Sequence, residues 1–541
     1  MQSIYWLIVS LSNRMKTMNK LISKVDKFLD KHTILWLALI MLVSLRVPNF
    51  FDPYWYGDEA IYLTVGQSIR SGKKLYQEIV DHKTPIIYYL ASVPNQFWFR
   101  VLLLAWMILS TALVYDLSKK LIKNKYVRWL VTFAFVLLTT LPTFEGHIPN
   151  GELFVMGFVL FGLWLLAKTN YLQQLWSKQT KKKERVVLVY LGGIFFGLGL
   201  LTKVPALLDF AAILSIGCFV FVDEFLAKPQ NWFKQIIKLL KTSLPLVLGL
   251  ITPILLSILY YVIRGSGQAY LQYGLLYNFH YTQTWQVDYG SQLLNFLISL
   301  NGKTLLLFSS ILGLSLIKTL KLKFKFLLSW FLLSVYAVLL SNRPYPHYFL
   351  QAMPPLVFLG AAVLEEVISY LKAKKKNIVQ LTPVFLTILF LLIIKSALNL
   401  LNFSQYAVKP YYQNFYRYAK SELNQEQYFQ TFNDLMSDNY QLSTFLKTQG
   451  VKELFIWGNN PMLYALSQTI PTCKFTVAFH VVDMKVFDET FVELKQAAPE
   501  YIVLMKNAYK NFPEFYTYLN NNYLPNHSYK HMVLYKQIKA N

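Results

Sequence analysis

The residues best suited to chemistry lie between Arg46 and Gln96. This stretch reads D-P-Y-W-Y-G-D-E-A-I-Y from Asp52 and S-G-K-K-L-Y-Q-E-I-V-D-H-K-T-P from Ser71. It gathers acids, a histidine, lysines and tyrosines in about fifty residues, whereas simple connections are far shorter. A positioned carboxylate can take a proton from an attacking hydroxyl, and a positioned lysine can stabilise a phosphate leaving group. The stretch therefore indicates group-transfer chemistry in a loop with structure of its own.

Two adjacent acids are the catalytic candidates. Asp58 and Glu59 follow Gly57 and precede an amphipathic segment that ends near Arg70. One interpretation is a helix N-terminus whose carboxylates complement the helix dipole. The other is that Asp58 acts as a general base, with Glu59 beside it. The two interpretations are compatible, because a helix N-terminus holds a carboxylate in a fixed place.

Lys83 is the first candidate for substrate binding. A lysine near a membrane can simply extend to the interface. Alternatively, Lys83 balances the negative charge that a phosphate leaving group gains as its bond breaks. Asp81 and His82 would then orient Lys83 or contact the sugar of the substrate.

Three later segments add polar side chains. They are E-G-H-I-P-N-G-E from Glu145, L-T-K-V-P around Lys203, and N-R-P-Y-P-H-Y from Asn342. The first can be a solvated turn, whereas arginine, histidine and tyrosine in the last suit a phosphate. The further candidates for substrate binding are Glu145, His147, Asn150, Glu152, Lys203, Arg343, His347 and Tyr348. No cofactor follows from these residues, although the acids would allow a divalent cation.

Composition indicates that a membrane positions these residues. The 541 residues are 55% apolar and only 15% charged, well below the charge of ordinary soluble proteins. The net charge of +25 would suit a nucleic-acid binder. However, the cations lie in short clusters between apolar runs, which is typical of cytoplasmic loops and requires no nucleic acid. Cys218 and Cys473 predict neither a disulfide nor a metal site.

Eleven apolar segments are predicted to cross the bilayer, each approaching the roughly 20 residues that a spanning helix needs. They are 33–51, 97–117, 129–144, 152–167, 186–202, 204–222, 244–263, 303–317, 326–341, 350–369 and 378–399. The fold class is thus a polytopic α-helical membrane protein.

Lysine and arginine set the predicted orientation. Cations from Arg14 to Lys31 precede the first segment, which places the N-terminus in the cytoplasm. Further clusters follow the even-numbered segments, at residues 119–128, 178–185, 228–241, 318–325 and 372–376. An odd number of crossings then places the C-terminus outside.

The chain divides into three predicted parts. Residues 1–32 form a cytoplasmic segment, residues 33–400 a membrane domain with a large outer loop at 46–96, and residues 401–541 a domain outside the membrane. In the last part, polar stretches alternate with apolar runs at 454–457 and 501–505, which predict buried strands. Helices are expected from residue 461 and over 489–497, so this domain is predicted to be α/β.

Four motifs resemble the GT-C glycosyltransferases, specifically the glycosyltransferase family 39 group of protein mannosyltransferases and bacterial lipid A aminoarabinose transferases. They are G-D-E-A-I-Y with S-G-K-K-L-Y and D-H-K-T-P, then N-G-E-L-F, G-L-G-L-L-T-K-V-P-A-L-L, and H-Y-F-L-Q-A-M-P-P-L. Each is weak alone, but their order and spacing over residues 30–400 make the combination specific. The stretch between Pro85 and Arg100 is shorter than in many relatives.

The resemblance implies inverting sugar transfer from a polyprenyl-phosphate donor to a lipid, glycan or protein acceptor. The expected setting is the outer face of a cell membrane, the bacterial cytoplasmic membrane. It implies a catalytic acid at Asp58, a phosphate-contacting lysine at Lys83, a second-loop acid at Glu152 and a tyrosine contact at Tyr348.

Two other functions remain open. A transporter or lipid flippase also has many crossings with buried charges, but such proteins often show paired repeats and broken helices, which are not evident here. An oligosaccharyltransferase or polymerase would use the same kind of helical membrane domain with a lipid-diphosphate donor. The chemistry of the donor separates these alternatives.

Overall fold

The computed structural model describes residues 32–173, 185–282, 285, 288–373, 377–403 and 405–538. The predicted cytoplasmic segment therefore lies outside the described residues except for its last position. The cation clusters at 178–183 and 374–376 also lie outside them.

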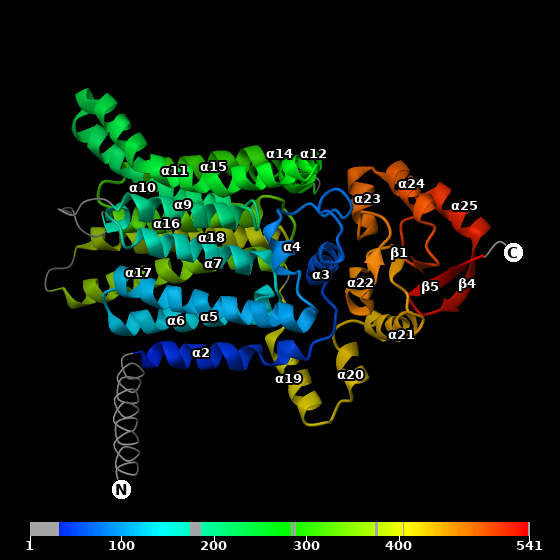
Figure 1. The fold of residues 1–541 in the computed structure, drawn as a ribbon. Coiled ribbons are helices and arrows are strands. Elements are labelled where there is room, and N and C mark those ends of the chain that lie inside the picture. The colour runs from blue at the N-terminus through cyan, green and yellow to red at the C-terminus, as the bar shows by residue number, and fades with distance from the viewer. Residues whose placement is uncertain are drawn as a thin grey trace, which may run out of the picture.

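Each of the eleven predicted segments contains a helix. They are α2 (Thr33–Arg46), α5 (Gln96–Leu121), α6 (Lys125–Leu138), α7 (Gly151–Leu166), α9 (Val186–Leu200), α10 (Ala206–Ala227), α11 (Trp232–Ile263), α15 (Leu300–Leu316), α16 (Leu322–Leu339), α17 (Met353–Lys372) and α18 (Thr382–Leu400). These helices lie side by side as one bundle, with the C-terminal domain beyond one end of it (Figure 1).

Some of these helices are long enough to cross a membrane, and others are shorter. Among the described residues, seven helical stretches are long and apolar enough to cross a membrane, or up to eight if the bent pair α14 (Gln292–Ile298) and α15 forms one span. Helices α7 and α9 are apolar but have 16 and 15 residues. At a rise of 1.5 Å per residue they cover roughly 24 Å, less than a typical hydrocarbon core. The helical membrane fold is confirmed, while the count of eleven crossings stays a prediction.

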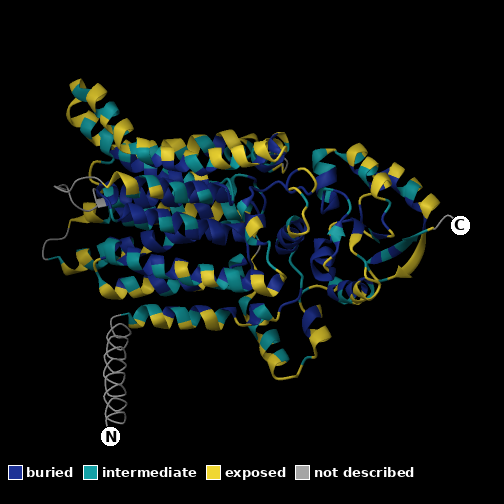
Figure 2. Cartoon of the chain, in the orientation of Figure 1, coloured by how far each residue is buried: buried dark blue, intermediate teal, exposed yellow. Residues whose placement is uncertain are grey.

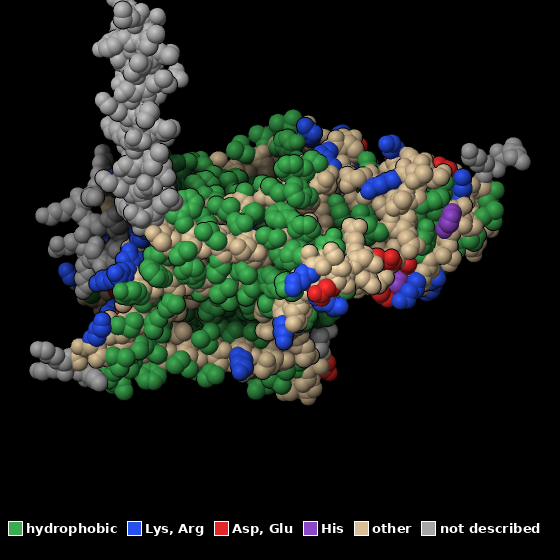
Figure 3. Space-filling model, turned by 90° about the horizontal axis from the view of Figure 1, so that it is seen from below, with side chains coloured by type: hydrophobic (Ala, Val, Ile, Leu, Met, Phe, Trp, Pro, Cys, Tyr) green, Lys and Arg blue, Asp and Glu red, His purple; other side chains and the backbone are tan. Residues whose placement is uncertain are grey.

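The flanks of the bundle expose apolar side chains. Leu255, Leu256 and Ile263 of α11 are exposed, as are Phe385 and Leu392 of α18. Buried residues concentrate between the helices and at the junction with the C-terminal domain (Figure 2). Seen from below, hydrophobic side chains cover the flank, and acids appear only toward the C-terminal domain (Figure 3). An apolar surface of this extent suits contact with lipid.

The C-terminal domain is built around a five-stranded sheet in the order β2-β1-β3-β5-β4. The strands are β1 (Glu453–Trp457), β2 (Ile470–Pro471), β3 (Tyr501–Met505), β4 (Tyr523–Ser528) and β5 (Met532–Gln537). Strand β1 pairs in parallel with β2 and β3, and β5 pairs antiparallel with β3 and β4. The α/β prediction and both predicted strands are confirmed.

Among the described residues of this domain, seven helices accompany the sheet. They are α19 (Val408–Ala419), α20 (Gln425–Gln430), α21 (Leu435–Thr448), α22 (Pro461–Ser467), α23 (Ala478–Met484), α24 (Phe487–Ala497) and α25 (Pro513–Asn522). The helices expected from residue 461 and over 489–497 correspond to α22 and α24.

The loop at residues 46–96, called the first loop below, lies between the bundle and the C-terminal domain (Figure 1). It contains α3 (Gly57–Arg70) and α4 (Ile86–Leu90). Gly66 lets α3 approach α4, because a Cβ there would lie 2.5 Å from the carbonyl oxygen of Ala91. Gln67 donates a 2.9 Å hydrogen bond to the carbonyl of Thr469, and the Val80 amide donates one of 2.7 Å to Lys474. These bonds fix the first loop against the C-terminal domain.

The predicted orientation can be tested with reporter fusions. The starts of α6 and α16 lie at the end of the bundle opposite the C-terminal domain (Figure 1). We therefore expect reporters after residues 125, 182, 322 and 375 to be cytoplasmic and a reporter after residue 450 to be outside, because lysine and arginine clusters resist translocation. A cytoplasmic reporter after residue 450 would contradict this orientation.

Candidate active site

Polar side chains from five segments meet where the first loop joins the bundle. Helix α3 supplies Asp58, the segment before α4 supplies Lys83, and the first turn of α7 supplies Glu152. Lys203 precedes α10, and His347 lies in the 3-10 helix η5 (Pro346–Ala352). Asp58 interacts electrostatically with Lys83, His347 and Lys203. The first loop and the later motifs therefore form one cluster, as the sequence motifs suggested.

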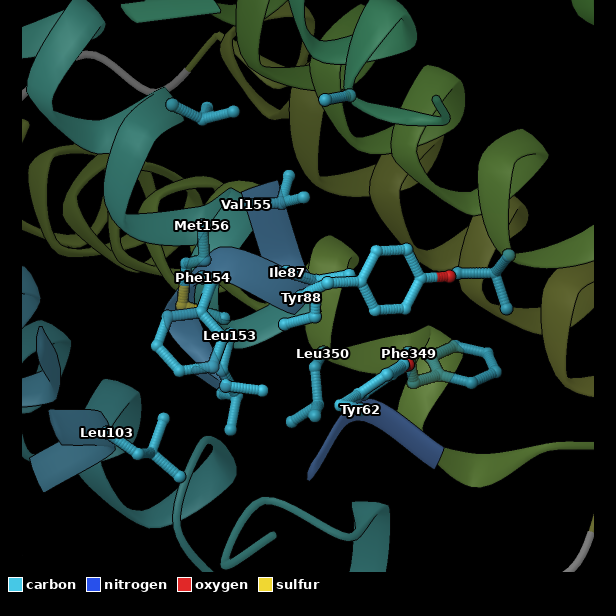
Figure 4. Close-up of a cluster of buried hydrophobic side chains, with 14 of the residues drawn as sticks. Tyr62, Ile87, Tyr88, Leu103, Leu153, Phe154, Val155, Met156, Phe349 and Leu350 are labelled. Atoms are coloured by element: carbon cyan, nitrogen blue, oxygen red, sulfur yellow. The ribbon is translucent and has the colours of Figure 1, made fainter. Parts of the chain in front are cut away.

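An apolar core holds the same elements together. Figure 4 shows side chains from α3, α4, α5, α7 and η5 packed against one another. They include Tyr62, Tyr88, Phe154 and Leu350, each less than 2% exposed. This packing limits the movement of the backbone that carries the polar cluster.

Asp58 and Lys83 form the centre of the cluster. Lys83 Nζ lies 3.3 Å from Asp58 Oδ2, and the Tyr62 hydroxyl donates a 3.3 Å hydrogen bond to the same oxygen. The Lys83 ammonium also lies 4.8 Å from the centre of the Tyr62 ring. The side chain of Asp58 is 29% exposed and that of Lys83 9%. The carboxylate therefore remains open to a substrate, while the lysine is largely enclosed.

Electrostatics keep both groups charged at neutral pH. Burial opposes the ionisation of Asp58, but Lys83, His347 and Lys203 outweigh it and lower the pKa of this carboxyl to about 2. Burial likewise opposes the charge on Lys83, yet Asp58, together with Tyr62, holds the pKa of the ammonium well above its usual value. The cluster thus offers an ionised carboxylate beside a full positive charge.

His347 connects Asp58 to a second acid. Its Nδ1 atom lies 2.5 Å from Glu145 Oε2, and its Nε2 atom lies 4.0 Å from Asp58 Oδ2. The Tyr56 hydroxyl donates a 2.6 Å hydrogen bond to the same Glu145 oxygen. A histidine held in this way by a carboxylate has a fixed ring orientation. Glu145 therefore positions His347 against Asp58.

Lys203 and Glu152 form a second ion pair in the cluster. The Lys203 ammonium lies 4.4 Å from the centre of the Tyr348 ring, which provides a cation–π contact. Two candidates, Glu152 and Tyr348, are thus brought to the same lysine. Like Lys83, Lys203 therefore has both a carboxylate and an aromatic ring as partners.

Arg343 lies at the edge of the cluster nearest the C-terminal domain. Its guanidinium is 4.2 Å from the centre of the Tyr281 ring and 5.3 Å from that of Trp285. It also forms a 4.0 Å ion pair with Asp483 of α23. Tyr281, at the end of α13 (Tyr277–Tyr281), interacts with Lys83 as well. Aromatic rings and a carboxylate therefore fix the Arg343 side chain at this edge of the cluster.

Three candidates lie apart from Asp58. Glu59 is buried and accepts hydrogen bonds from Arg100 at 2.8 Å and from Gln96 at 3.0 Å. Glu59 therefore pairs with Arg100 and does not lie beside Asp58 in the polar cluster, where a second catalytic residue was expected. His147 packs against Trp55 and Tyr411 with ring centres 6.4 and 4.8 Å away, and burial holds its pKa well below the usual value.

Asn150 is the third of these candidates. Its side-chain amide donates a 3.4 Å hydrogen bond to the backbone carbonyl of Glu145. It therefore supports the turn that carries Glu145 instead of contacting Asp58.

Some residues of the site carried little or no sequence signal. Tyr56 and Tyr62 belong to the D-P-Y-W-Y-G-D-E-A-I-Y stretch, so the sequence indicates that they lie near Asp58. It does not indicate their hydrogen-bond partners. Tyr281 and His480 lie in segments without a motif. They reach the site through α13 and α23, which fold back toward the first loop.

One group of side chains in the described part of the chain has the composition of a metal site. It consists of Asp81, His82 and His480, all buried, whose potential ligand atoms lie within 4.8 Å of one another. Asp81 and His82 directly precede Lys83 in the sequence. Asp81 and His82, expected to assist Lys83, are therefore next to it but contact the C-terminal domain.

Comparisons with known proteins give distant likenesses. No family model and no curated protein matches the chain. It is similar to the structure of ArnT from Cupriavidus metallidurans bound to undecaprenyl phosphate, with 12% identity over 94% of this chain and 98% of that one and a TM-score of 0.49.

A second similar structure is the archaeal oligosaccharyltransferase AglB from Archaeoglobus fulgidus in complex with an inhibitory peptide and a dolichol-phosphate. The identity is 13% over 88% of this chain and 70% of that one, with a TM-score of 0.42. Both neighbours are GT-C glycosyltransferases, the class that the sequence motifs resemble. At these identities and TM-scores, residue roles have to come from this chain's own contacts.

Proposed function

We propose that the chain is a membrane glycosyltransferase that moves a sugar from a polyprenyl-phosphate donor to a hydroxyl of a lipid, glycan or protein acceptor, with inversion at the sugar carbon. The observation that carries this proposal is the Asp58–Lys83 pair, with 3.3 Å between Oδ2 and Nζ. A proton acceptor and a cation for phosphate lie side by side at the end of an apolar helical bundle. This arrangement supports the use of a lipid-borne phosphate donor.

The proposed reaction uses both members of the pair. The acceptor oxygen attacks the sugar carbon and forms the new glycosidic bond while Asp58 takes the hydroxyl proton. The bond from that carbon to the phosphate oxygen breaks, and the phosphate keeps the electron pair. Lys83 stabilises the charge that develops on the phosphate as this bond breaks. The products are the glycosylated acceptor and the polyprenyl phosphate.

Donor binding also activates the base in this proposal. Without donor, Lys83 helps to lower the pKa of Asp58 to about 2, which makes the carboxylate a weak proton acceptor. A donor phosphate competes for the same ammonium. As Lys83 turns from the carboxylate to the phosphate, the pKa of Asp58 rises toward that of an ordinary carboxyl group. The base therefore becomes stronger when the donor is in place.

The remaining polar residues are assigned supporting roles. Lys203 and Arg343 add positive charge for the phosphate, with Glu152 and Asp483 orienting them. His347, held by Glu145, limits the movement of Asp58. The ion pairs of these side chains support the proposed roles.

The proposed setting is a cell membrane of the bacterial cytoplasmic type, with the N-terminus inside and the C-terminal domain outside. The apolar flanks of the bundle allow a polyprenyl chain to remain in the bilayer while its phosphate reaches the cluster (Figure 3). The acceptor would approach from the side of the C-terminal domain.

The direct test uses the purified full-length protein with a labelled polyprenyl-phosphate sugar. Mass spectrometry of envelope glycans and glycolipids, with and without the protein, identifies the acceptor. We expect label to move from the donor to the acceptor. Transfer only from lipid-diphosphate donors would instead support an oligosaccharyltransferase or polymerase. Movement of the lipid across the bilayer without transfer would support a flippase.

Removing one cation should weaken the use of the donor. We expect Lys83→Ala and Arg343→Ala each to lower kcat/KM for the donor by roughly 10- to 150-fold, which corresponds to one charge-assisted hydrogen bond of about 1.5–3 kcal/mol. Lys83→Arg should restore little, because a planar guanidinium presents its donors differently from an ammonium. Steady-state kinetics with varied donor measure the effect.

Lys74→Ala is the matched control, since Lys74 is an exposed lysine of the same loop. It should leave donor kinetics unchanged. Wild-type donor kinetics in both Lys83→Ala and Arg343→Ala would place the phosphate elsewhere.

A further inference from the structure

Three buried side chains join the first loop to the C-terminal domain. Asp81 Oδ1 lies 3.0 Å from His82 Nδ1 and 3.3 Å from His480 Nε2. The two ring nitrogens are themselves 3.3 Å apart. Asp81 and His82 precede Lys83, whereas His480 lies in α23, almost four hundred residues away in the sequence. Three potential ligand atoms thus form a nearly equilateral triangle.

Two sides of this triangle, at 3.3 Å, match one face of a metal tetrahedron, and the third side, at 3.0 Å, is slightly shorter. Zinc bonds to histidine nitrogen and carboxylate oxygen of about 2.0–2.2 Å place tetrahedral ligand atoms roughly 3.3–3.6 Å apart. Hydrogen bonding alone would direct ring N–H groups at Asp81 Oδ1, an oxygen that already accepts a 2.8 Å hydrogen bond from the His82 backbone amide. A cation at the centre would use both nitrogen lone pairs and the carboxylate charge together.

The surrounding residues hold Asp81 and His82 in place. The Tyr88 hydroxyl donates a 2.7 Å hydrogen bond to Asp81 Oδ2, the oxygen that faces away from the histidines. The His82 ring stacks on Tyr281 with ring centres 4.5 Å apart. Asn278 donates a 3.1 Å hydrogen bond to the His82 carbonyl. A hydrogen bond to the outer oxygen is the kind of contact that orients a ligating carboxylate in metal sites.

We propose that Asp81, His82 and His480 bind a divalent transition-metal ion, with Zn²⁺ as the best fit. Two imidazoles and one carboxylate suit zinc rather than Mg²⁺ or Ca²⁺, which prefer oxygen ligands. Three protein ligands leave the fourth tetrahedral position to water. The ion clamps the first loop to the C-terminal domain and thereby fixes the backbone next to Lys83. This site rests on its own geometry and not on the proposed sugar transfer.

The test measures metal in the full-length protein purified in detergent without chelator. We expect about one zinc ion per chain after equilibration with Zn²⁺ and removal of excess. In competition with a chromogenic chelator, His480→Ala should bind zinc roughly 100-fold more weakly or worse. His527→Ala is the matched control, because His527 is an exposed histidine of the same domain, and it should bind zinc as wild type does.

A second variant, which should gain a spectroscopic band, tests the site even if His480→Ala folds poorly. His480→Cys supplies a thiolate in place of the imidazole, so its Co²⁺ form should show a sulfur-to-cobalt charge-transfer band that the wild-type Co²⁺ form lacks. Chelation should also lower the Tm of the wild-type protein but not that of His480→Ala. The proposal is overturned if folded wild-type protein binds no zinc, if His480→Ala binds it with wild-type affinity, or if Co²⁺-loaded His480→Cys lacks the band.

Discussion

Replacing Asp58 with asparagine is expected to lower the rate of sugar transfer by about 10²–10⁴-fold, the usual contribution of a positioned base. The amide has nearly the same shape and can accept the hydrogen bond that Tyr62 donates to Asp58 Oδ2. It cannot accept the acceptor's proton as a carboxylate can. The change also removes the negative charge beside Lys83, which leaves the ammonium free for the donor phosphate. Donor binding should therefore be retained or strengthened.

Two measurements separate catalysis from folding in this variant. One follows label transfer under saturating donor, and the other follows donor binding at equilibrium. Asp488→Asn makes the same substitution in the first turn of α24, where the acid is exposed, and should change neither. Near-normal transfer by Asp58→Asn would reject Asp58 as the base. Loss of donor binding together with transfer would show that the carboxylate mainly supports the structure.

Apolar periodicity predicted the bundle better than it predicted the sheet. Long apolar runs were sufficient because a lipid-facing helix must be apolar along nearly its whole length. Strands β1 and β3 were found because most of their residues are buried. Strand β4 is exposed at every position after Tyr523, so its sequence has no apolar alternation. It exists through backbone pairing with β5, which composition does not reveal.

The site was predictable where its residues share a motif and not where folding brings distant segments together. The motifs located Asp58, Lys83 and His347, and the structure brings all three into one cluster. The motifs could not locate His480, because its partners lie in the first loop. Glu59, the second predicted catalytic residue, faces Arg100 instead of Lys83, because adjacent residues on a helix do not share a face. Asp58 and Glu59 are adjacent residues of α3, yet the carboxylate of Asp58 is open to substrate and that of Glu59 is buried.

Glu59→Gln is expected to destabilise the protein by about 3–5 kcal/mol, the usual cost of removing one partner of a buried ion pair. Glu59 accepts two hydrogen bonds of 2.8 Å from Arg100, and both side chains are only 1% exposed. Glutamine retains the size of the side chain but leaves the Arg100 charge without this carboxylate. Unfolding by denaturing detergent measures the loss of stability. We also expect a lower yield of folded protein.

The folded fraction of Glu59→Gln should transfer sugar at a rate close to that of the wild type, because Glu59 faces Arg100 and not the cluster around Asp58. Adding Arg100→Met should recover part of the stability, since the double variant no longer buries an unpaired charge. A stable Glu59→Gln protein that has lost turnover would instead return Glu59 to the catalytic role that its position in the sequence suggests. Asp58→Asn and Glu59→Gln thus make the same chemical change at neighbouring positions with opposite expected effects, one on rate and one on stability. The contrast follows from the partner of each carboxylate, a lysine open to substrate for Asp58 and an enclosed arginine for Glu59.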